Sequence, residues 1–253
     1  MLRHLLAAAL LVLAPTAAGA AEIVRVGGYD FPPFVEARPD GPTGLTLDLI
    51  DLFNRSQSDY EFRFVSVSAR RRYGDLEDGR FDAMFFESPD WEWAARGLPV
   101  EFSDVFLTGG EVFIAQATPG RGQDYFDDLK GKRLVGILGY HYRFAGFDAD
   151  PDRLSRAFDI KLVNSHASSI EMVALGRKDI AVVTDAYLWA YLSRNPAVKD
   201  KLLVSDRHDQ DYRHRILVRR GGPVTVGRID ALLARLRKSG ALDTLWRKAG
   251  VVR

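Results

Sequence analysis

Strand-forming and helix-forming segments alternate along the chain, and this alternation limits the possible fold more than any other feature. Ile23–Val26, Glu61–Val67 and Phe81–Phe86 are short runs rich in apolar, β-branched or aromatic residues, which predicts strands. Apolar residues at positions 45, 49, 52 and 53 recur at helical spacing, and a second short helix is expected to end at Gly79. Strands that are separated by helices pair in parallel, so we expect an α/β fold built on a parallel sheet.

A second block with the same order follows the turn at Pro119–Gly122. Its predicted strands are Leu134–Leu138, Ile160–Val163 and Ile180–Thr184. Ligands of open parallel sheets lie beyond the carboxyl ends of the strands. Glu87 and Asp185 follow the last strand of each block, so a cleft between two such lobes would receive one acidic side chain from each.

Composition excludes several classes of function. The 253 residues are 47% hydrophobic, which argues against disorder, and they include no cysteine, which excludes disulfides, cysteine nucleophiles, iron–sulfur clusters and thiolate zinc sites. Lys and Arg number 35 against 34 Asp and Glu, so no overall basic field favours nucleic acid. The sequence has no nucleophile elbow, zinc-protease motif, P-loop or dinucleotide fingerprint.

The N-terminus has the pattern of an export signal. Arg3 precedes the apolar run Leu5–Ala14, and Ala18–Ala20 provides small residues for cleavage, which predicts a signal peptide over residues 1–20. The run is shorter than the ~20 residues that a membrane span needs. No cysteine follows that could accept a lipid anchor. We therefore expect an exported protein, located in the periplasm of a bacterium.

Seven segments occur in an order that is shared with a known family. They are Phe31–Phe34, Gly44–Leu49, Leu76–Ala83, Arg96 with Phe102–Asp104, Asp128–Arg133, Gly176–Asp185 and Ala231–Lys248. Through these segments the chain resembles the bacterial extracellular solute-binding proteins of the polar amino-acid type, which serve ABC importers. The resemblance covers essentially the whole chain after residue 20.

The resemblance implies the fold of a type II periplasmic binding protein, in which two Rossmann-like α/β lobes are joined by two hinge strands. Lobe 1 would comprise residues 22–114 and 213–253, and lobe 2 residues 115–212. The implied partners are a small-molecule ligand, an amino acid or similar carboxylate, and an ABC permease in the inner membrane. We expect a monomer with no cofactor and no metal.

The resemblance also implies a charged residue on each side of the cleft. Arg96, six residues before Phe102, matches the arginine that grips the ligand carboxylate, a role that suits a planar guanidinium. The alternative is a surface arginine in a loop. Asp185 matches the aspartate that accepts the ligand ammonium, but it would also suit the N-cap of the helix that follows. The register leaves Thr184 as the alternative ligand contact.

Other ligand contacts are implied in lobe 1. Phe31 matches a stacking aromatic residue, with core packing as its alternative. Phe86, Glu87 and Ser88 follow the lobe-1 strand, where backbone groups and a hydroxyl meet the ammonium. The segment 86–95 is about two residues longer than the family pattern. Its tryptophans, Trp91 and Trp93, either wall the pocket or pack the loop.

In lobe 2, Tyr140 and His141 occupy the place of the family's Gly-Thr-Thr turn, whose free N–H groups can bind a carboxylate. His141 could titrate near neutrality, or it could be an exposed turn residue. Arg70–Arg72 at a helix start are expected to be solvated, although one of them could reach the cleft. Five acidic and histidine residues within 206–214 are assigned to a polar connector near a hinge strand and not to a metal site.

We therefore predict a receptor that docks its ligand on lobe 1 and closes lobe 2 over it. Two alternatives use the same scaffold. One is a periplasmic dehydratase acting on a cyclic carboxylate, with Glu87 or Asp185 as general acid. The other is a ligand-sensing subunit of a signalling receptor.

Overall fold

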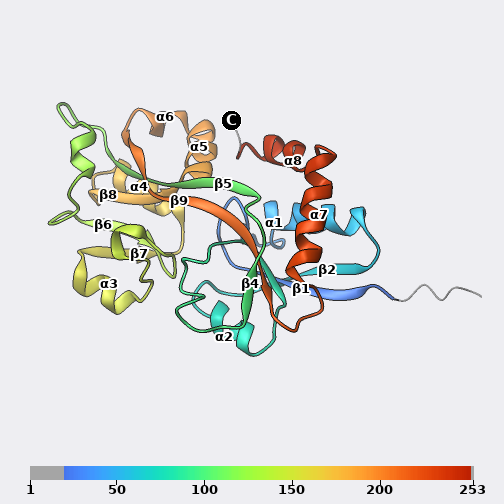
Figure 1. The fold of residues 1–253 in the computed structure, drawn as a ribbon. Coiled ribbons are helices and arrows are strands. Elements are labelled where there is room, and N and C mark those ends of the chain that lie inside the picture. The colour runs from blue at the N-terminus through green and yellow to red at the C-terminus, as the bar shows by residue number, and fades with distance from the viewer. Residues whose placement is uncertain (1–19, 252–253) are drawn as a thin grey trace, which may run out of the picture.

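Two α/β lobes lie side by side and are joined by two long strands (Figure 1). The structure is a computed structural model that describes residues 20–251. The predicted signal peptide, apart from Ala20, lies outside these residues. No helix within the described range is long and apolar enough to span a membrane. The predicted fold class, a type II periplasmic binding protein fold, is confirmed.

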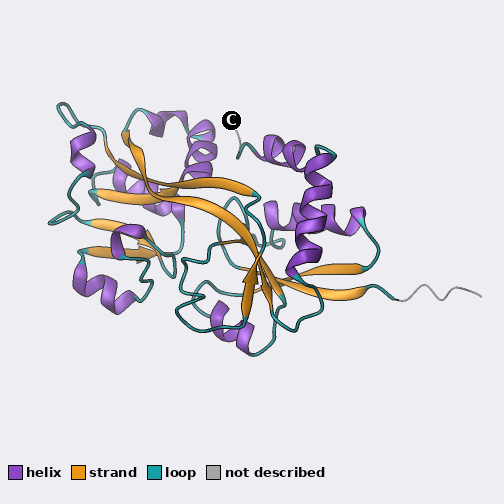
Figure 2. Cartoon of the chain, viewed as in Figure 1, coloured by secondary structure: helices purple, strands orange, loops and turns teal. Residues whose placement is uncertain are grey.

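Lobe 1 contains a sheet with parallel strands at its edge. Its strands are β1 (Glu22–Gly28), β2 (Tyr60–Ser66), β3 (Ala83–Glu87) and β4 (Val100–Phe102). β1 pairs in parallel with both β2 and β3, as the alternating pattern predicted. The helices of this lobe are α1 (Leu45–Ser56), α2 (Arg72–Glu77), α7 (Val226–Lys238) and α8 (Ala241–Ala249). Helix α1 packs against β2 and against the two C-terminal helices, α7 and α8. These three helices together cover the sheet (Figure 2).

Lobe 2 repeats the parallel arrangement. Its strands are β6 (Leu134–Ile137), β7 (Ile160–Val163) and β8 (Ile180–Thr184), and β6 lies in parallel between the other two. Its helices are η1 (Gln123–Phe126), η2 (Arg143–Ala145), α3 (Pro151–Ala157), α4 (His166–Ala174), α5 (Asp185–Arg194) and α6 (Pro196–Lys199). The apolar residues of β8 are fully buried, which explains its uninterrupted hydrophobic sequence.

Two antiparallel strands connect the lobes. β5 (Leu107–Gln116) pairs with β8 of lobe 2, and β9 (Leu202–Arg219) pairs with β5, β3 and β4. The chain therefore crosses between the lobes twice, and the predicted lobe boundaries fall inside these hinge strands.

The prediction of a polar connector over residues 206–214 was wrong, because this segment is the middle of β9. Residues 206–208 are all exposed, and exposed and buried positions alternate over 210–214, while the buried Asp209, Gln210 and His214 make side-chain hydrogen bonds. No group of three or more metal-ligating side chains occurs within residues 20–251.

Candidate functional site

A small cavity lies where the two lobes meet the hinge strands. We call it the central cavity, and its lining residues are Tyr29, Phe31, Trp91, Glu111, Tyr140, His141, Gln210 and Tyr212. Tyr29 and Phe31 follow β1, Tyr140 and His141 follow β6, and Gln210 and Tyr212 lie on β9. Glu111 lies on β5, and Trp91 lies in the loop after β3. The cavity therefore adjoins the carboxyl ends of parallel strands in both lobes. Its volume is about 10 Å³, which is room for about one water molecule.

Aromatic rings surround the central cavity. Phe31 stands at the centre, with its ring centroid 5.3 Å from that of Tyr140 in lobe 2. The Phe31 centroid also lies 5.8 Å from the centroids of Tyr29, Trp91 and Tyr212. Such edge-to-face and stacked pairs stabilise the contact beyond the burial of their area. Around the central cavity the lobes thus meet through an aromatic cluster.

Gln210 on hinge strand β9 connects both lobes at this cavity. Its Nε2 donates to Glu111 Oε2 over 2.7 Å and also donates to the carbonyl oxygen of His141. Its Oε1 accepts a hydrogen bond of 3.1 Å from Trp91 Nε1. A single amide therefore links the loop after β3, both hinge strands and the turn after β6.

Glu111 is the acidic side chain of the central cavity. It is fully buried on β5, and its Oε1 has no hydrogen-bond partner in the structure. Burial, followed by the negative charge of Asp209, raises the pKa of Glu111 to about 8, although hydrogen bonding to Gln210 and to the Tyr212 hydroxyl acts in the opposite direction. The carboxyl group is therefore mostly protonated at neutral pH.

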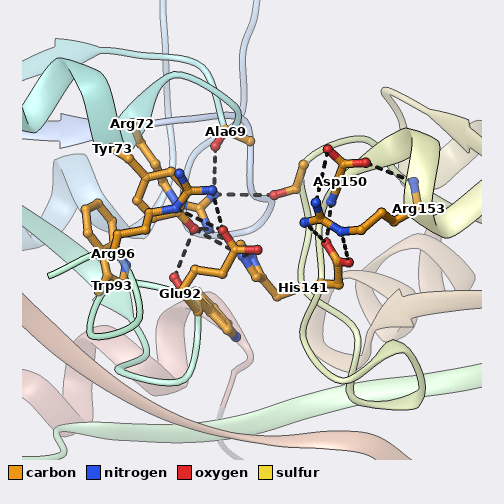
Figure 3. A network of polar contacts seen from close by, with 12 residues as sticks. Ala69, Arg72, Tyr73, Glu92, Trp93, Arg96, His141, Asp150 and Arg153 are labelled. Atoms are coloured by element: carbon orange, nitrogen blue, oxygen red, sulfur yellow. Dashed lines mark hydrogen bonds and ion pairs between the residues drawn. The ribbon is translucent and has the colours of Figure 1, made fainter. Parts of the chain in front are cut away.

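Arg72 and His141 form the principal polar contact between the lobes (Figure 3). Arg72, at the start of α2, is 1% exposed, and its NH2 group lies 3.0 Å from His141 Nδ1. Burial, together with the charges of Arg72 and Arg96, lowers the pKa of His141 to about 2. The neutral ring accepts from Arg72 at Nδ1, so Nε2 holds the proton and can donate to the Tyr73 hydroxyl 3.1 Å away.

A second, more open space adjoins this contact, and we call it the outer pocket. Its volume is about 230 Å³, and lobe 1 contributes Glu92 and Arg96 while lobe 2 contributes Asp150 and Arg153. His141 lines both the outer pocket and the central cavity. Charged side chains of both signs thus surround a solvent-accessible gap between the lobes (Figure 3).

Comparison with known proteins identifies the family. The model of the bacterial extracellular solute-binding proteins, family 3, matches residues 24–250. The chain belongs to this family. The resemblance that was inferred from sequence segments is therefore confirmed. No curated protein matches the chain.

Solved structures show the same fold at low sequence identity. A mutant of ArgBP from T. maritima is 22% identical, with a TM-score of 0.68 over 91% of this chain and 96% of that chain. The GluR0 ligand-binding core, in complex with L-glutamate, is 18% identical, with a TM-score of 0.70 over 91% and 99%. A histidine kinase sensor domain with similarity to periplasmic binding proteins is 21% identical, with a TM-score of 0.67 over 90% and 96%.

In this solute-binding protein, Arg96 lines the outer pocket and not the central cavity. Its NH2 group lies 2.5 Å from Glu92 Oε2, and its guanidinium carbon lies 4.1 Å from the Tyr73 ring centroid. The side chain is 47% exposed, on the surface that faces lobe 2 across the gap. The predicted carboxylate-gripping arginine therefore lies between the lobes, already paired with an acidic neighbour.

Asp185 and Thr184 line neither space. Thr184 is buried, with its Oγ1 3.3 Å from His166 Nε2, and it occupies the N-cap position of α5. The alternative that Asp185 is the N-cap was therefore wrong. Asp185 begins the helix, where its Oδ1 accepts from the backbone N–H of Ala186 and its Oδ2 lies 3.6 Å from His208 Nε2.

The residues predicted after β3 separate into two groups. Trp91 lines the central cavity, together with Phe31, Tyr140 and His141 from the other predicted segments. Phe86, Glu87 and Ser88 do not line it. Their contacts lie within lobe 1: the Phe86 ring packs on Phe34, Glu87 accepts from Trp93 Nε1, and Ser88 accepts from the backbone of Asp90.

Several cavity residues were missed by sequence reasoning. They are Tyr29, Glu111, Gln210 and Tyr212. Of Arg70–Arg72, which were expected to be solvated unless one reached the cleft, Arg72 is buried and contacts His141 of lobe 2. Glu111 had a readable signal, because it is the one charged residue in the strand sequence LTGGEVFIAQ. An isolated acidic residue in a buried strand requires a specific partner or function.

Proposed function

We propose that this protein captures a small polar solute, most simply an amino acid or a similar carboxylate, and delivers it to an ABC permease of the inner membrane. The observation that supports this proposal is the joint construction of the central cavity and outer pocket by both lobes at the hinge strands. Export through the N-terminal segment would place the protein in the periplasm. There it would act as a monomer.

Capture requires the lobes to separate, because the central cavity holds only about one water molecule when they are in contact. Phe31 and Trp91 belong to lobe 1, whereas Tyr140 and His141 belong to lobe 2, so a rotation about β5 and β9 would enlarge the space. The ligand would bind the open lobe 1 and then favour the closed arrangement through contacts with lobe 2.

The ligand carboxylate would meet guanidinium groups on lobe 1. Arg96 faces the gap from the loop before β4, and separation of the lobes would also remove His141 from Arg72. A guanidinium can donate two parallel hydrogen bonds to a carboxylate. Arg96 is half exposed and is therefore accessible to an incoming solute.

A thermal-shift screen tests this proposal with amino acids, small carboxylates and amines. A ligand at 100 times its Kd should stabilise the protein by about 2.7 kcal/mol, which raises Tm by roughly 5–10 °C for a chain of this size. Arg96→Ala should abolish the shift for carboxylate ligands. Arg55→Ala on the exposed face of α1 is the matched control and should leave it unchanged. If carboxylate ligands raise the Tm of the Arg96→Ala variant as much as that of the unaltered protein, Arg96 does not contact the ligand.

A second candidate, an enzyme on the same scaffold, is favoured by the raised pKa of Glu111. A protonated carboxyl group among aromatic rings could serve as a general acid, as the elimination of water from a cyclic carboxylate requires. Incubation of the stabilising ligand with the protein, followed by NMR, separates the two functions. A receptor returns the ligand unchanged, whereas an enzyme returns a dehydrated product.

A further inference from the structure

The central cavity has a composition that suits one chemical class of ligand. We infer that Glu111, enclosed by aromatic rings at the junction of the lobes, receives a methylated ammonium group of the ligand. This inference rests on the proposed function, since it assumes that the ligand enters the central cavity when the lobes separate.

The first argument is the position of an unpaired acceptor. Glu111 is fully buried and lines the cavity, and its Oε2 is bonded to Gln210. Its Oε1 is the one buried side-chain oxygen or nitrogen among the lining residues that has no hydrogen-bond partner in the described chain. A buried polar group without a partner is costly, so a ligand cation that pairs with the ionised carboxylate gains affinity.

The second argument is the aromatic enclosure. Five rings line the cavity with this carboxyl group: Tyr29, Phe31, Trp91, Tyr140 and Tyr212. The faces of such rings carry negative electrostatic potential and attract cations, most strongly where water is excluded. The Tyr29 ring already has a cation beside it, since the Arg72 guanidinium carbon lies 4.7 Å from its centroid. The remaining four rings belong to both lobes and to β9, and they can close around a second cation.

The third argument distinguishes a methylated ammonium from a primary one. A primary ammonium has three N–H donors, and each needs an acceptor when it is buried. Apart from Glu111, the acceptors that the lining side chains offer are the hydroxyl oxygens of Tyr29, Tyr140 and Tyr212, because both ring nitrogens of His141 and the Gln210 amide already have partners. A quaternary ammonium has no donor to satisfy, and its methyl groups pack against aromatic rings. The cavity therefore favours the methylated cation.

Binding of a cation should release a proton. Ionised Glu111 is stabilised by the cation, whereas in the free protein burial holds its pKa at about 8. At pH 7 the carboxyl group holds about 0.9 proton, which the ligand would displace. Affinity should then rise roughly tenfold between pH 6 and pH 7 and level off above pH 8.

Other ionisable groups face Glu111 from every neighbouring element. They are Asp209 and Tyr212 on β9, Asp185 on α5, Tyr140, His141 and Tyr142 after β6, and Tyr29 with Arg72 on the lobe-1 side. The two aspartates add to the attraction for a cation. Arg72 opposes it; its guanidinium carbon lies 4.7 Å from the centroid of the Tyr29 ring.

Isothermal titration calorimetry tests the inference with glycine betaine and glycine, which differ by three methyl groups on nitrogen. The chain without residues 1–20 is titrated at pH 7 in phosphate and in Tris, because buffers of different ionisation enthalpy report the protons released. We expect glycine betaine to bind at least tenfold more tightly than glycine, with release of about 0.9 proton. Tetramethylammonium should compete with it.

Glu111→Gln should lower the affinity for glycine betaine at least tenfold and abolish proton release. Glu77→Gln, on the exposed face of α2, should change neither the affinity nor the proton release. Proton release by the unaltered protein is a readout that does not depend on the folding of any variant. If an ordinary amino acid binds without proton release and equally well to Glu111→Gln, the inference is wrong and the proposed function stands. If none of the amino acids, carboxylates or ammonium compounds binds, both are wrong.

Discussion

Replacement of Glu111 by glutamine should make the stability of the protein less dependent on pH. In the folded chain burial raises the pKa of Glu111 from its ordinary value of 4.5 to about 8, so the folded state binds this proton more tightly than the unfolded state. The favourable contribution of protonated Glu111 is fully present below about pH 4.5 and is lost as the pH rises toward 8. The 3.5-unit difference corresponds to about 5 kcal/mol, since each unit is worth about 1.36 kcal/mol.

Urea unfolding at pH 5.5 and pH 7.5 measures this effect. Glutamine has the shape of the protonated carboxyl group but cannot ionise, so the variant should gain about 3 kcal/mol relative to the unaltered protein between these two pH values. Glu77→Gln, at an exposed position of α2, is the control and should show no such gain. A difference between variant and unaltered protein that stays constant from pH 5.5 to 7.5 would refute the reasoning.

Three further substitutions test the inter-lobe contact and the stability of lobe 1. His141→Ala removes the partner of Arg72 in lobe 2 and should shift the protein toward separated lobes, seen as a larger radius of gyration in X-ray scattering; an unchanged radius would contradict this. Asp82→Ala leaves Arg25 and the partly buried Arg219 without their carboxylate and should lower the free energy of unfolding in urea by about 3 kcal/mol at pH 7. Burial alone would raise the pKa of Asp82, but hydrogen bonds from both arginines outweigh it and hold the pKa below its ordinary 3.8. The loss should therefore shrink below pH 4, where Asp82 becomes protonated. Gly44→Ala should lower stability by about 2 kcal/mol or more, because φ is +119° there and the new Cβ would lie 2.8 Å from two backbone oxygens; an unchanged Tm would contradict this.

The strands of the parallel sheets could be predicted closely because their sequences differ sharply from their surroundings. Ile160–Val163 and Ile180–Thr184 were predicted with the ends that the structure has, since each is a mostly apolar, β-branched run between polar turns. β9 could not be predicted in this way. Its middle contains charged residues at exposed positions, and it forms a strand because β5 provides the pairing partner along most of its length.

The candidate site was predictable in part. Residues that follow strand ends, such as Phe31, Trp91, Tyr140 and His141, could be proposed from the order of segments, and they line one cavity in the structure. Arg72 could not be distinguished from Arg70 and Arg71, because three consecutive arginines have no pattern that separates a buried one from two exposed ones. Only the packing of α2 against Tyr29 and Trp93 selects it.

By itself the sequence determined the family, the α/β class and the division into two repeated blocks. These features depend on local periodicity and on the order of segments, which the chain contains before it folds. Tertiary structure alone decided how the two blocks meet. A carboxyl group on a hinge strand, an amide on the other and rings from both lobes become neighbours only when distant segments pack together, and the resulting loss of water gives Glu111 its raised pKa.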